Sequence, residues 1–134
     1  MEIKSTEVTL NASTEEVYNF LIDAQNIYHL LPQDKISNWE ATETACSFKV
    51  QQAATISLIQ DEVSPNSSIK MISGEKSPFP FTLTIVINDS GEGMSSGYIH
   101  FNGEINAFLK MMVEKPLTNL FNYMSDKLQK RFEA

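Results

Sequence analysis

Apolar residues recur every three or four positions along the last quarter of the chain. The stripe consists of Ile105, Phe108, Leu109, Met112, Pro116, Leu117, Leu120, Phe121, Met124, Leu128 and Phe132. This spacing predicts a single long amphipathic helix over residues 105–132. At 1.5 Å per residue, a helix of about 28 residues spans roughly 42 Å, which is comparable with the diameter of a domain of this size. We therefore expect the helix to lie across the rest of the molecule, with its apolar side covered by a sheet.

The N-terminal part of the chain predicts one strand followed by two short helices. Residues 3–11 alternate in the way that is typical of a half-buried strand, with Val8 and Leu10 on the face opposite Ile3. Ser13 is a suitable N-cap for the first helix, and Glu16 completes a capping box. A second short helix is expected over residues 27–31, because Asn26 can cap it and Pro32 ends it.

The middle of the chain has the pattern of strands. Six are predicted, over residues 36–40, 45–50, 54–63, 68–74, 79–88 and 94–104. Their short connections imply an antiparallel meander. A sheet of seven such strands curls because its twist accumulates, and the long helix can fill the concave side. The predicted fold is therefore α+β: a seven-stranded curved antiparallel sheet around a long C-terminal helix.

Composition narrows the class of protein without naming a function. A length of 134 residues fits one domain, and no apolar run approaches the roughly 20 residues that span a bilayer. Ten basic residues against seventeen acidic ones give a net charge of −7, which disfavours binding to nucleic acid. The single cysteine, Cys46, excludes an intramolecular disulfide and gives no set of metal ligands. We expect a cytoplasmic protein without membrane insertion.

Three stretches give the chain a resemblance to a known superfamily. They are residues 8–21, which contain the strand and the capped first helix, residues 26–32, which end at Leu31-Pro32, and residues 108–117 in the long helix. Together with the order of elements, they resemble the helix-grip fold of the START-like superfamily, also called polyketide cyclase, SRPBCC or birch-pollen-allergen-like proteins. The resemblance implies a cavity between sheet and long helix that binds apolar or amphipathic small molecules. It does not choose among carriers, enzymes and chaperone activators.

Strand parity and helix face select ten residues as expected contacts of a small hydrophobic ligand. They are Phe48, Ile56, Leu58, Met71, Phe81, Leu83, Ile85, Phe101, Phe108 and Met112. The first hypothesis is that the protein binds such a molecule without catalysis, cofactor or metal, as a monomer or weak homodimer.

Two other classes of function stay open. If the last strand had the opposite register, Tyr98, His100 and Glu104 would line the cavity and could act as general acid and base in a cyclase-like enzyme. Alternatively, the sheet edge or an exposed Phe79-Pro80-Phe81 could bind a protein partner, as in the chaperone activators that the chain resembles. His29 on the second short helix is expected to be partly exposed, and Cys46 to behave as a small buried hydrophobe.

Overall fold

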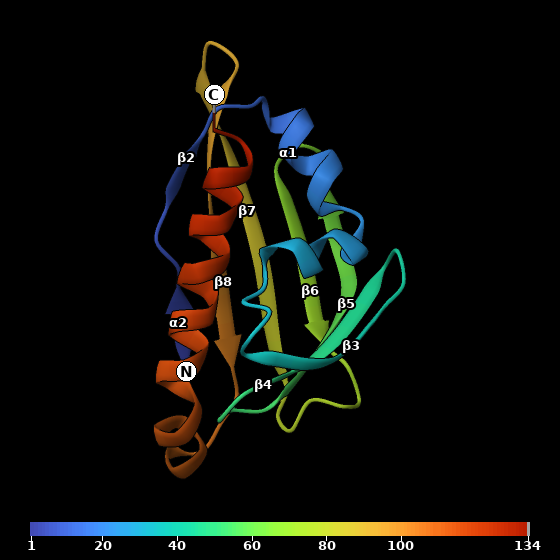
Figure 1. Cartoon of the computed structure of the whole chain (residues 1–134), viewed down its shortest axis with the longest axis vertical. Helices are drawn as coiled ribbons and strands as arrows, with labels where there is room; N and C mark the ends of the chain where they lie inside the picture. Colours follow the sequence, from blue (N-terminus) through green and yellow to red (C-terminus); the bar gives the residue numbers. More distant parts are fainter. Residues whose placement is uncertain (134) are drawn as a thin grey trace.

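The computed structural model describes residues 1–133 and contains one curved antiparallel sheet with the helices on a single side of it (Figure 1). The strand order is β1-β8-β7-β6-β5-β4-β3, and β2 also pairs with β8. Strands and helices have the following bounds: β1 Glu2–Lys4, β2 Val8–Leu10, α1 Thr14–Leu21, η1 Ala24–Leu30, β3 Ile36–Ala41, β4 Ala45–Val50, β5 Thr55–Ser64, β6 Ser68–Ser73, β7 Phe81–Gly91, β8 Met94–Gly103 and α2 Ala107–Arg131. The predicted meander and long C-terminal helix are confirmed.

The expected first strand is broken, so the sheet has eight strands rather than seven. β1 and β2 both pair with β8, with Ile3 opposite Phe101 and Val8 opposite Gly97. Between them Ser5 turns its side chain into the core, where its Oγ accepts the backbone N–H of Ile99 at 2.8 Å. The break also shifts the inward and outward alternation of side chains by one position. As a result, Ile3 and Val8 are both buried. The prediction that they lie on opposite faces was wrong, because it assumed an uninterrupted strand.

The two short helices follow β2 as expected. The N-cap of α1 is Ser13, whose side chain accepts the backbone N–H of Glu16, and its inner face buries Val17, Tyr18 and Leu21. The second, η1, is a 3-10 helix that begins three residues earlier than predicted. Asp23 caps it instead of Asn26, because the Asp23 carboxylate accepts the backbone N–H of Gln25.

The helix α2 begins after Asn106, whose side chain accepts the backbone N–H of Leu109. It packs against β1, β2, β8 and η1. All its buried side chains lie at or after position 113: Val113, Leu117, Leu120, Phe121, Met124, Ser125 and Leu128. The first turns of the helix therefore project past the sheet (Figure 1). Within residues 1–133, no helix is long and apolar enough to cross a membrane.

Candidate binding groove beside the long helix

The inner face of the sheet is closed by packed side chains. Phe101 is fully buried, and its ring centroid lies 4.9 Å from that of Phe81 and 5.1 Å from that of Phe121 on α2. The strand residues predicted as ligand contacts all face this core and are buried: Phe48, Ile56, Leu58, Met71, Phe81, Leu83, Ile85 and Phe101. Their facing was predicted correctly. Together they leave little free volume in the core.

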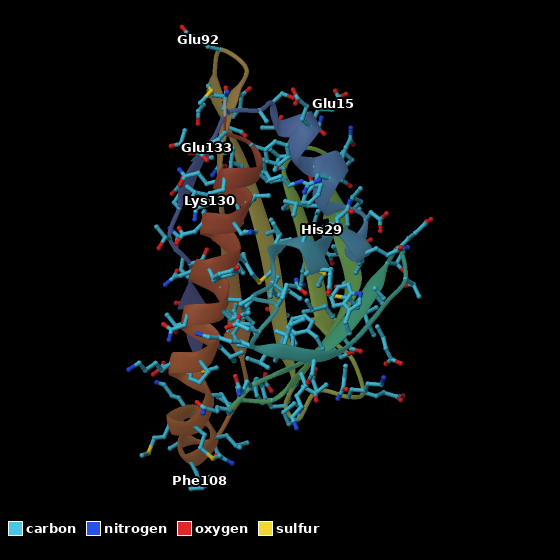
Figure 2. The ribbon with its side chains drawn as sticks, viewed as in Figure 1. Glu15, His29, Glu92, Phe108, Lys130 and Glu133 are labelled. Carbon is cyan, nitrogen blue, oxygen red and sulfur yellow. The ribbon has the colours of Figure 1, made fainter. Side chains whose placement is uncertain are left out.

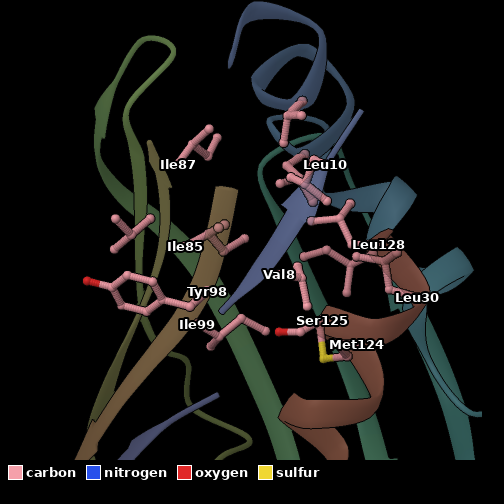
Figure 3. A pocket seen from close by; sticks show the side chains of 15 residues that line it. Val8, Leu10, Leu30, Ile85, Ile87, Tyr98, Ile99, Met124, Ser125 and Leu128 are labelled. Atoms are coloured by element: carbon pink, nitrogen blue, oxygen red, sulfur yellow. The ribbon is translucent and has the colours of Figure 1, made fainter. Parts of the chain in front are cut away.

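One small cavity lies between the sheet and the C-terminal half of α2 (Figure 3). Its volume is about 20 Å³, which is room for roughly one water molecule. Its lining residues are apolar apart from Tyr98 and Ser125, and of the ten expected contacts only Ile85 is among them. A cavity of this size cannot hold an organic ligand without movement of the core.

Two of the expected contacts, Phe108 and Met112, are not in the interior. Phe108 is 70% exposed and Met112 is 52% exposed, and Figure 2 shows Phe108 at the projecting end of α2. The prediction failed because it assumed that the whole length of the helix faces the sheet, whereas the buried face of α2 begins only at Val113. Val113, which the predicted stripe omitted, is buried.

The residues expected in a cyclase-like site face away from the core. The Tyr98 ring points to the opposite side of β8 from Val8, Leu10 and Leu128 (Figure 3), and the Lys4 ammonium lies over it at 4.3 Å. His100 Nε2 lies 2.8 Å from a Glu2 carboxylate oxygen on the outer face, and Glu104 is exposed. Tyr98 is among the residues that line the small cavity, but its ring points away from it, and His100 and Glu104 do not line it. The opposite register is therefore wrong, and the three side chains do not meet in one site.

The remaining candidate residues do not form a functional site either. Phe79 and Phe81 are both buried, so the exposed apolar patch proposed for Phe79-Pro80-Phe81 is absent. Burial raises the pKa of the Cys46 thiol to about 12, which keeps it protonated and a poor nucleophile at neutral pH. His29 is exposed, as expected. Across residues 1–133, no three histidine, cysteine or acidic side chains are grouped to hold a metal ion.

A much larger open space lies beside the middle of α2. This α2 groove has a volume of about 590 Å³ and is lined by Pro32, Asp34, Lys35, Val50, Gln51, Gln52, Lys115, Pro116, Asn119, Leu120 and Tyr123. One wall is α2, and the other consists of the loop after η1 and the end of β4. Backbone bonding joins the two parts of that second wall, because the Gln51 N–H donates to the Lys35 carbonyl at 2.9 Å.

The groove has an apolar floor and a polar rim. Pro32, Val50 and Leu120 are buried, whereas Lys35 and Lys115 are exposed. The turn at residues 51–54 separates the groove from a second recess of about 270 Å³, whose lining includes Phe79, Met112 and Val113. Both recesses thus lie along α2, on either side of one turn of the chain.

Sequence reasoning did not find the α2 groove. Gln51 and Gln52 fall between two predicted strands, and Lys115 and Asn119 lie outside the predicted apolar stripe of the helix. Neither pattern carries a signal of binding. The groove comes from tertiary structure: η1 and its following loop bring Pro32 and Lys35 opposite a helix that lies eighty residues later in the chain.

Solved structures share this architecture across the whole chain. The KanY protein matches with a TM-score of 0.77 at 16% identity, over 100% of this chain and 98% of that one. A protein from Thermus thermophilus matches with a TM-score of 0.74 at 18% identity, over 98% and 97% of the two chains. A START superfamily protein from Mycobacterium smegmatis matches with a TM-score of 0.69 at 11% identity, over 98% of this chain and 96% of that one. No family model and no curated protein matches the sequence.

Proposed function

Because the chain has the START-like helix-grip fold, we propose that it binds a small hydrophobic or amphipathic molecule between sheet and C-terminal helix, without catalysing a reaction. The START-like neighbours suggest a ligand-binding fold. The observation that carries the proposal is the α2 groove, at about 590 Å³. Pockets for small molecules usually have 300–1,000 Å³, an apolar lining and a few polar groups.

The groove is the favoured position because it has room for a small molecule, which the enclosed cavity lacks. The enclosed cavity behind the C-terminal half of α2 holds about 20 Å³. In the groove, an apolar part of the ligand would lie against Val50 and Leu120, and its polar part would face the exposed rim. This distribution favours an amphipathic molecule over a purely hydrocarbon one.

The test is native mass spectrometry of the protein purified gently from its own host, followed by denaturation and identification of what is released. The proposal predicts one amphipathic class of molecule at near-stoichiometric amount. In Asn119→Trp an indole would fill the groove from an exposed helix position, and the released amount should fall at least tenfold. Asp126→Trp is the matched control, because Asp126 is an exposed position on α2 outside the groove lining. In this variant the released amount should not change. Equal amounts from both variants would contradict this site, and no released molecule from the wild type would count against the proposed function.

A further inference from the structure

We propose that the α2 groove selects amphiphiles that carry one carboxylate, which Lys35 and Lys115 bind at the rim while the hydrocarbon part lies on the apolar floor. This inference rests on the proposed function and names the class of ligand for the same groove. Two observations support it: the lining of the groove is net positive, and its positive charges lie at the rim.

The charge of the groove is opposite to that of the whole chain. The chain has ten basic and seventeen acidic residues, whereas the charged members of the groove lining are Lys35, Lys115 and Asp34. Two of these three are cationic, although they come from positions eighty residues apart. A local positive site in a negative protein attracts an anion only at short range, so the groove should bind an anion by contact at its rim.

Within residues 1–133, no carboxylate oxygen lies within 4.0 Å of the Lys35 or Lys115 ammonium group. In the described chain, salt bridges within 4.0 Å join Lys70 to Asp61, Lys76 to Glu40 and Lys110 to Glu114, and none involves Lys35 or Lys115. Asp34 lies in the same lining but is not within 4.0 Å of either ammonium. Both lysines are therefore available to a ligand without the loss of an existing ion pair.

The net charge of the rim favours a monoanion. With Asp34 ionised, two ammonium groups leave a surplus of one positive charge, which a carboxylate cancels and a phosphate dianion exceeds. Gln51, Gln52, Asn119 and Tyr123 add neutral side-chain donors around the same rim. These groups can satisfy the second carboxylate oxygen without changing the balance of charge.

The apolar floor determines the rest of the ligand. Val50 and Leu120 are buried side chains that face the groove from opposite walls, and Pro32 and Pro116 flank them. None of these four side chains has a polar group that could pair with a second polar end of the ligand. An alkyl or aromatic body with a single polar end fits this arrangement.

The experiment compares three ten-carbon probes by isothermal titration calorimetry at pH 7.5 and low salt: decanoate, decan-1-ol and decyltrimethylammonium. They share a tail and differ in the charge of the head. Wild-type protein should bind decanoate about three- to tenfold more tightly than decan-1-ol, as expected for exposed charge pairs. It should bind the cation most weakly. The preference for decanoate should shrink in 1 M salt.

Methionine substitutions separate the charge from the apolar stem of each lysine. Lys35→Met and Lys115→Met should each remove part of the preference for decanoate, and the double variant should bind decanoate and decan-1-ol equally. Lys130→Met changes the net charge by the same amount at an exposed position outside the groove, and it should keep the preference.

The outcomes distinguish this inference from the function on which it rests. Equal binding of decanoate and decan-1-ol by the wild type, or an undiminished preference in the double variant, would overturn the carboxylate assignment and leave an amphiphile-binding groove. If none of the three probes binds, both the assignment and the proposed function fail.

Discussion

The buried hydroxyl pair at the break in the first strand gives the sharpest test of the fold. Ser5 Oγ accepts the Ile99 backbone N–H at 2.8 Å and lies 2.8 Å from Ser125 Oγ on α2. Both serines are buried, and Figure 3 shows the Ser125 hydroxyl directed toward Ile99. One side chain thus connects β8, the N-terminal segment and the long helix.

Alanine substitutions of Ser5 and Ser125 should lower the free energy of unfolding by unequal amounts. Ser5→Ala leaves the Ile99 N–H and the Ser125 hydroxyl without their partner, and an unsatisfied buried group costs about 1–3 kcal/mol. The Ser125 hydroxyl can turn to a carbonyl of its own helix, so we expect a total loss of about 2–4 kcal/mol. Ser125→Ala removes one hydrogen bond but leaves Ser5 bonded to Ile99, and should cost only about 1 kcal/mol.

Urea unfolding of the wild type, both single variants and the double variant measures these losses. At an m-value of 1–3 kcal/mol/M, a loss of about 3 kcal/mol lowers the midpoint by roughly 1–3 M urea. The double variant should be less destabilised than the sum of the singles by about 1 kcal/mol, because the two serines share one interaction. Strict additivity, or a cost for Ser125→Ala that equals the cost for Ser5→Ala, would refute this description of the break.

Two further predictions concern the core and its thiol. Phe101→Ala should lower the free energy of unfolding by about 3–5 kcal/mol, because a packed, fully buried ring is lost. Phe108→Ala should change it by less than about 0.5 kcal/mol. Similar urea midpoints for the two variants would contradict the exposure of Phe108 at the projecting end of α2. The pKa of the Cys46 thiol is raised from 9.0 to about 12 by burial, so the unfolded chain loses this proton at lower pH than the native one. The free energy of unfolding should therefore fall as the pH rises from 9 toward 12, and more steeply than in Cys46→Ala. The native thiol should also resist iodoacetamide at pH 8 until urea unfolds the protein. Rapid labelling of the native protein would contradict the burial of Cys46.

The fold could be predicted from local patterns because most of its elements follow them. Alternation in residues 79–88 placed Phe81, Leu83 and Ile85 on one face, and all three are buried. The capping residue Ser13 fixed the start of α1 to within one residue. The break at Ser5 could not be predicted, because a serine in an alternating strand has the same sequence signal whether it bonds to solvent or to a neighbouring strand.

The site was predicted less well, for a physical reason. Periodicity reports which side of an element is apolar, and it correctly placed Phe48 and Phe101 in the core. It does not report where a helix leaves the sheet, which decided the exposure of Phe108 and Met112. Nor does it report which loop lies opposite which helix turn, and that arrangement creates the α2 groove.

The most direct test of an amphiphile site in the α2 groove is a titration of ¹⁵N-labelled protein with decan-1-ol, followed by ¹H–¹⁵N correlation spectra. This neutral probe tests the groove independently of its charge. The account predicts saturable shifts clustered at residues 50–52 and 115–123, and their loss in Asn119→Trp. Saturable shifts confined to the β7–β8 hairpin, or no shifts up to the solubility limit of decan-1-ol, would contradict it.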